Sequence, residues 1–132
     1  MTVCKQRSLN YLGVVVWLAL ATTFAFNTAS AADYLNGEEI KELLSGNTLE
    51  GPGDWRMYYD PSGQTRGQEG SITDTGKWEV LDDRYCIRWN NWVDGKRMCW
   101  KVKRKGKRIN RVGIDGTGSS KVTINEGNPA GL

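Results

Sequence analysis

The sequence predicts a small, mainly β domain: an antiparallel meander closed into a barrel or folded into a sandwich, with one short N-terminal helix and one disulfide. Three observations predict this fold class. Short apolar runs typical of strands recur along the chain, and glycine-containing turn signals separate them. No segment after the first 33 residues has the length of the crossover helices that join parallel strands, so the strands are expected to be antiparallel.

The first 32 residues have the pattern of a secretory signal peptide. Lys5 and Arg7 precede an uncharged, mainly apolar run over 11–26, and small residues follow over 29–32. The run is shorter than the ~20 residues that a membrane-spanning helix needs. We therefore interpret 1–32 as a signal peptide rather than a retained anchor.

Export would leave a single β domain over 33–132, in the periplasm or outside the cell, without a transmembrane segment. The small residues allow cleavage after Ala31 or Ala32. One of the three cysteines lies in the signal peptide, so Cys86 and Cys99 remain. In an oxidising compartment such a pair is expected to form a disulfide.

Charge is distributed unevenly along the exported chain. Residues 33–83 contain twelve acidic and four basic residues, whereas 84–132 contain three acidic and twelve basic residues. The two halves can neutralise each other across the fold, or they can form a bipolar surface that attracts charged partners.

One helix is expected, directly after the cleavage region. Asn36 can cap it, and Glu39 three residues later completes a capping box. An apolar stripe follows at Ile40, Leu43 and Leu44, and Gly46 can end the helix in a left-handed turn. So short a helix needs a larger partner to pack against. That partner is the sheet, whose strands are expected at 55–60, 76–81, 85–89, 96–102, 109–114 and 121–124.

The cysteines set the register of two strands. If Cys86 faces Cys99, then Tyr85 faces Trp100, and residues 90–95 form the connecting loop. One face of this pair then carries Tyr85, Ile87, Met98, Trp100 and Val102, and the other carries Cys86, Arg88, Arg97, Cys99, Lys101 and Lys103. For the whole domain we expect a core that includes Trp78, Val80, Ile87, Trp100 and Ile114.

The polar face of these strands is a candidate anion-binding surface, made of Arg88, Arg97, Lys101 and Lys103. Arginine pairs suit carboxylate and phosphate groups, which anionic lipids and polysaccharides of the cell envelope supply. The structural alternative is that these side chains extend into water or pair with acids of the other half. Trp92 in the loop is a second candidate, because it either folds over the barrel end or contacts a ligand.

Several kinds of chemistry are excluded. The chain has no histidine, so catalytic pairs and zinc sites that need one are absent, and we assign no catalytic residue, metal or cofactor. Nucleic-acid binding is not expected, because the predicted pleat separates aromatic side chains from cations. Carboxylates that could supply an acid/base pair for a hydrolase remain at Glu38, Glu39, Asp60, Asp74, Asp82 and Asp83.

The chain resembles a family of small exported bacterial proteins that form a domain of unknown function. The resemblance rests on L-x-G-x-E-I-x-x-L-L-S-G-N-T (35–48), Y-x-D-P-S-G-x-x-x-G (58–67), D-T-G-K-W-x-V (74–80), the C-I-R-W…M-C-W pair and G-N-P-x-x-L (127–132). It implies a shared fold and export, but no established activity. The D-x-G-x-W element is also similar to one in lipocalin- and avidin-like barrels, an analogy of fold that does not give function.

We expect a non-catalytic protein that binds a small ligand or another envelope macromolecule. Two alternatives stay open. One is an inhibitor that presents loop 90–95 to a secreted hydrolase, and the other is a hydrolase that works through carboxylates in a barrel mouth.

Overall fold

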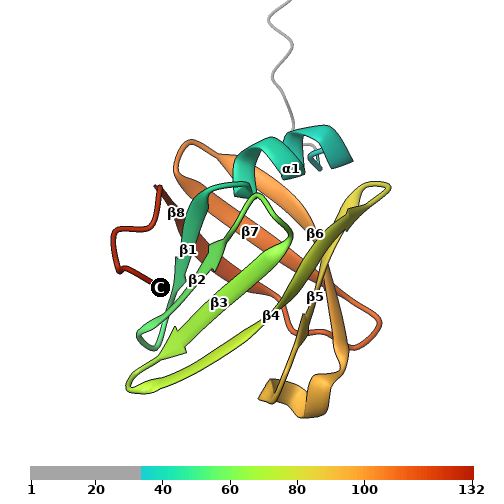
Figure 1. Cartoon of the computed structure of the whole chain (residues 1–132). Helices are drawn as coiled ribbons and strands as arrows, with labels where there is room; N and C mark the ends of the chain where they lie inside the picture. The colour runs from blue at the N-terminus through green and yellow to red at the C-terminus, as the bar shows by residue number, and fades with distance from the viewer. Residues whose placement is uncertain (1–33) are drawn as a thin grey trace, which may run out of the picture.

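A computed structural model of the chain describes residues 34–132, which form a closed antiparallel barrel preceded by one α-helix (Figure 1). The predicted signal peptide, residues 1–32, lies outside the described residues. The elements are α1 (Gly37–Leu44), β1 (Asn47–Gly51), β2 (Trp55–Tyr59), β3 (Gln64–Glu69), β4 (Ile72–Leu81), β5 (Arg84–Trp89), the 3₁₀ turn η1 (Trp92–Gly95), β6 (Arg97–Lys105), β7 (Arg108–Ile114) and β8 (Ser120–Glu126).

The strands follow one another around the barrel in chain order. Each pairs antiparallel with the next, and β8 closes the sheet by pairing with β1, where Leu49 lies opposite Ile124. The predicted mainly β fold is confirmed, and of the two expected architectures the protein has the barrel.

Helix α1 has the predicted boundaries. The Asn36 side chain accepts a hydrogen bond from the Glu39 backbone N–H, and the Glu39 carboxylate accepts one from the Asn36 N–H, which completes the capping box. Gly46 follows with a φ of +77°, a conformation that glycine adopts without strain. The helix lies over one end of the barrel (Figure 1) and buries its apolar stripe there. Within residues 34–132 no helix combines the length and apolar character needed to cross a membrane.

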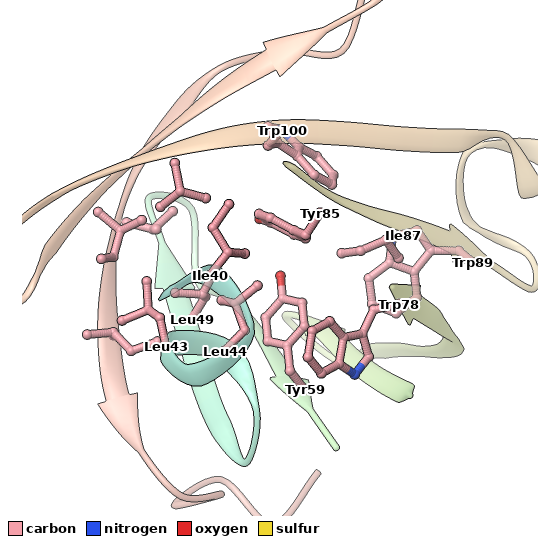
Figure 2. Packing of buried hydrophobic residues seen from close by; sticks show 14 residues of the cluster. Ile40, Leu43, Leu44, Leu49, Tyr59, Trp78, Tyr85, Ile87, Trp89 and Trp100 are labelled. Atoms are coloured by element: carbon pink, nitrogen blue, oxygen red, sulfur yellow. The ribbon is translucent and has the colours of Figure 1, made fainter. Parts of the chain in front are cut away.

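Aromatic side chains fill the middle of the barrel (Figure 2). The ring of Tyr59 meets those of Trp78 and Tyr85 edge-on, with centroids 5.4 and 5.8 Å away. Tyr85 in turn stacks on Trp100 at 5.2 Å. Such pairs add to the stabilisation that the burial of large apolar surfaces provides.

The core prediction is mostly confirmed. Trp78, Ile87 and Trp100 are buried, and Val80 is half-buried against the core. The prediction for Ile114 is wrong. Ile114 lies opposite Cys99, on the face that carries the disulfide, while its neighbour Gly113 lies opposite the inward-facing Trp100. Strand alternation therefore directs Ile114 outward, although its apolar character suggested the core.

The Cys86–Cys99 disulfide is present, with an S–S distance of 2.07 Å. The two cysteines lie opposite each other in the β5–β6 ladder, and the predicted register holds for the neighbouring pairs Tyr85–Trp100, Ile87–Met98 and Arg88–Arg97. The bond therefore joins two strands that are already paired.

Reduction of this disulfide is expected to add two hydrogen atoms to the mass of the protein and to lower its free energy of unfolding by about 2–3 kcal/mol. The stability loss arises because the unfolded chain gains the freedom of an open loop. Intact-mass spectrometry and denaturant titration, with and without reductant, measure both effects. Free thiols in unreduced protein exported by its host would contradict the expectation.

Candidate functional site

The barrel end opposite α1 holds a cavity of about 400 Å³. The β5–β6 connection, the coiled segment at the bottom of Figure 1, lies at this end. Four of the six tryptophans of the chain and two methionines line the cavity, namely Trp55, Trp89, Trp92, Trp100, Met57 and Met98. Its size and its mainly apolar walls are those of a small-molecule site.

Two inward-facing glycines leave room for these rings. A Cβ atom at Gly67 would collide with the ring of Trp92 and lie 2.7 Å from the ring of Trp89. A Cβ atom at Gly51 would collide with the ring of Trp55. The shape of the cavity therefore depends on the absence of side chains at positions facing the barrel interior.

Arg111 also lines the cavity, and it is only 5% exposed. Its Nε and Nη2 donate hydrogen bonds to the hydroxyl of Ser120 at 2.9 and 2.8 Å, and its Nη1 donates to the hydroxyl of Tyr85 at 3.4 Å. The guanidinium carbon lies 4.6 Å from the ring centroid of Trp55 and 4.7 Å from that of Trp100. At these distances the cation interacts favourably with both ring faces.

No carboxylate within residues 34–132 forms an ion pair with Arg111. Burial alone lowers the pKa of its guanidinium, but the surrounding hydroxyls of Tyr85 and Tyr59 favour the charged form and raise that pKa overall. Burial also raises the pKa of Tyr59 well above its ordinary value, so this hydroxyl stays neutral and does not balance the charge. A buried cation without an opposite charge is costly to the folded state.

One polar group of the cavity lining, the indole N–H of Trp89, lacks a hydrogen-bond partner. Trp89 is 2% exposed, and its indole N–H makes no hydrogen bond in the described part of the chain. Its ring packs against that of Trp92, with centroids 4.7 Å apart. Buried donors in folded proteins are nearly always paired, so this unpaired N–H is costly to the folded state.

Asp74 holds the loop that borders the cavity. Its carboxylate accepts hydrogen bonds from the backbone N–H groups of Trp92 (2.8 Å) and Asn91 (2.9 Å), from the Asn91 side-chain amide (3.0 Å) and from the Thr75 N–H (2.9 Å). Burial would raise the pKa of Asp74, but these donors outweigh it and the pKa lies below the ordinary 3.8. The ionised carboxylate therefore determines where Trp92 sits.

The same loop contains backbone strain. Val93 and Asp94 have φ values of 56° and 53°, in the left-handed region that a β-branched residue such as valine rarely adopts. Each such residue costs roughly 1–3 kcal/mol, and such strain is concentrated at binding and active sites. Val93 lines the cavity and is 49% exposed, so the strained turn forms part of the rim.

Of the two roles considered for Trp92, the structure shows the first: it folds over the barrel end against Trp89. It also lines the cavity, and contact with a ligand stays a prediction. Sequence reasoning missed Arg111, although a signal was present. In the run INRVGI, Arg111 alternates with Asn110 and Val112 and shares a face with the buried Ile109, which is an unusual place for a charge.

The four cations of the predicted anion face, Arg88, Arg97, Lys101 and Lys103, lie on the outer side of β5 and β6. Arg88 is directly opposite Arg97, as predicted. Arg97 forms an ion pair with Glu79 at 3.1 Å, and Lys101 forms one with Asp83 at 2.9 Å. Two members of the row therefore have acidic partners from the other half of the chain, and such exposed pairs contribute little to stability.

The carboxylates considered for a hydrolase do not meet in the cavity. Glu38 and Glu39 lie on α1, Asp60 follows β2, Asp82 and Asp83 follow β4, and Asp74 is engaged by the loop. Glu69 is the one acidic residue among the described residues that line the cavity.

Comparison with protein-family models, with curated proteins and with solved structures gives no match. The family resemblance that the motifs indicate stays a prediction.

Proposed function

We propose that this protein binds a small organic anion in the cavity opposite α1, without catalysis. The negative group of the ligand lies at Arg111, and its apolar or aromatic body lies between the tryptophans. The observation that carries this proposal is the buried guanidinium of Arg111, which no carboxylate of the described chain neutralises. A ligand that brings its own negative charge would remove that cost.

The chemistry of the buried guanidinium suggests a carboxylate. The guanidinium presents several donors that match the two oxygens of a carboxylate, and water is largely excluded around it. The rings of Trp55 and Trp92 supply flat apolar surfaces, which suit a planar body.

The alternatives have less support. A carboxylate hydrolase needs two acidic groups on either side of the scissile bond, and the described cavity lining offers Glu69 alone. An inhibitor that works through loop 90–95 would present its largest apolar side chain outward, whereas Trp92 is packed on Trp89. With the predicted export, the proposal describes a binding protein of the periplasm or the cell exterior.

Titration calorimetry with 2-naphthoate and its neutral amide tests the proposal. We expect the carboxylate to bind at least about tenfold more tightly than the amide, because a charge-assisted hydrogen bond contributes about 1.5–3 kcal/mol. In Arg111→Gln this preference should disappear, while the free energy of unfolding changes by no more than about 1 kcal/mol, since removal of a costly buried charge offsets the lost contacts.

Arg88→Gln is the matched control, because it removes the same charge from the outer surface. It should leave the affinity for 2-naphthoate unchanged. The proposal is wrong if carboxylate and amide bind equally well, if neither binds, or if both substitutions weaken carboxylate binding to the same extent.

A further inference from the structure

The closed barrel converts the charge asymmetry of the sequence into two sides of the molecule. The acidic half of the chain forms α1 and β1–β4, and the basic half forms β5–β8. Because the strands follow one another around the barrel, strands of the two halves pair only at the β4–β5 and β8–β1 seams, and the halves also meet where α1 and the residues before it pack against β5 and β6. At the α1 end of the barrel, Glu39 and Glu42 line a hollow together with Arg104 and Lys107, so opposite charges face each other there as well.

Ion pairs in the described residues neutralise basic side chains near one seam only. Asp83 pairs with Arg84 at 3.5 Å and with Lys101 at 2.9 Å, and Glu79 pairs with Arg97 at 3.1 Å. All three pairs are beside the β4–β5 seam, and the remaining pair lies within the acidic half. The outer face of β6, β7 and β8 keeps its positive charge.

Five cations line a single groove, and four of them lie on that face: Lys103, Lys105, Arg108 and Lys121. The fifth, Arg104, lies opposite the buried Ile109. In the sheet Lys103 and Lys121 lie on either side of Asn110, and Lys105 lies opposite Arg108. None of the four forms an ion pair within residues 34–132. The groove encloses about 740 Å³, and Glu50 at β1 is the one acidic residue among the described residues that line it.

We propose that this groove binds a chain of acidic polysaccharide, with successive sugar carboxylates at the lysines and at Arg108. The groove lies on the outer surface, so this site is separate from the cavity of the proposed function. Opposed like charges on a sheet are unfavourable on their own. A linear polyanion that lies along the groove, in contact with these four cations, would remove this repulsion.

The lining favours a polysaccharide over two other polyanions. No residue that lines the groove in the described chain is aromatic, whereas single-stranded nucleic acid is held by stacking on aromatic rings. A bilayer surface is flat and is bound by cations next to exposed apolar side chains. Of the exposed large apolar residues of the described chain, Ile72, Leu81 and Val93 do not line the groove, and Tyr34 contacts only its edge, where the Nζ of Lys103 lies 4.4 Å from the ring centroid.

Fluorescence anisotropy with a labelled oligogalacturonate tests this site. We expect binding at low salt that weakens steeply as salt is added, because exposed charges are screened beyond about 10 Å at 0.1 M salt. A labelled neutral dextran of the same length should not bind. If the oligogalacturonate does not bind at low salt, or binds no better than dextran, the proposal fails.

The variant Lys105→Gln/Arg108→Gln/Lys121→Gln locates the site. Since one exposed ion pair changes an equilibrium constant by up to about fivefold, loss of three cations should weaken binding roughly tenfold or more. The matched control is Arg88→Gln/Lys96→Gln/Arg97→Gln, which changes net charge equally on β5, β6 and their connection and should retain most of the affinity.

Two outcomes would overturn the assignment. Equal losses in the two triple variants would mean that net charge, not the groove, attracts the polymer. Tighter binding of phosphatidylglycerol vesicles or of oligothymidylate than of oligogalacturonate would mean that the basic face serves a membrane or a nucleic acid. Circular dichroism of each variant shows that the barrel is still folded.

Discussion

Replacement of Trp100 by alanine is expected to lower the free energy of unfolding by about 3–5 kcal/mol, the usual cost of removing a buried large aromatic side chain. Trp100 is 3% exposed and stacks on Tyr85. Its indole N–H donates a hydrogen bond to the carbonyl of Gly118 at 2.9 Å, and its ring lies against the guanidinium of Arg111. The substitution would remove all of these contacts and leave Arg111 with one aromatic neighbour fewer.

Denaturant unfolding measures this loss, and Trp92→Ala is the matched control. Trp92 is only half-buried and lies in the loop, so its removal should cost roughly 1–2 kcal/mol less than removal of Trp100. A loss below about 1 kcal/mol for Trp100→Ala would contradict the placement of this ring in the interior.

The β5–β6 hairpin could be predicted from the sequence because two independent constraints agree there. The disulfide aligns Cys86 with Cys99, and the alternation of apolar and polar residues assigns the same faces. Helix α1 could be predicted because the capping box and the apolar stripe are local signals. Both features depend on residues near one another in the chain.

Strands β1 and β3 could not be predicted, because they lack apolar alternation. The inward positions of β1 include Leu49 and Gly51, and those of β3 include Thr65 and Gly67. The glycines leave space for tryptophan rings that come from β2, β5 and the following loop. A strand that makes room for large side chains of its neighbours carries few apolar side chains itself, so its pattern resembles a loop.

The cavity is hidden in the sequence for a related reason. Its walls come from β2, β3, β5, η1, β6 and β7, and only barrel closure brings both Trp55 and Trp100 against the guanidinium of Arg111. The predicted anion face rests on the pattern of one hairpin, β5–β6. That pattern indicates which cations of the hairpin are exposed, but not that Arg111 of β7 is buried.

Replacement of Asp74 by alanine is expected to destabilise the protein by about 3–4 kcal/mol, because four hydrogen bonds to a charged acceptor are lost together and three of the donors are backbone groups. Asp74→Asn keeps one oxygen acceptor and should cost about half as much. The backbone of Trp92 loses its anchor in Asp74→Ala and keeps a weaker one in Asp74→Asn, so acrylamide should quench the tryptophan fluorescence more strongly in both variants and most strongly in Asp74→Ala.

The pH dependence of the free energy of unfolding shows whether Asp74 holds the loop through its negative charge or through packing alone. The pKa of Asp74 lies below its ordinary value of 3.8 in the folded protein, so the ionised carboxylate contributes stability above that value. This contribution is lost as the pH falls through the lower pKa of the folded state. The difference in unfolding free energy between wild type and Asp74→Asn should therefore be constant from pH 7 to about pH 5 and shrink below about pH 4. A difference that stays the same down to pH 2.5 would show that Asp74 acts through shape alone, and that its charge does not hold the loop over the cavity.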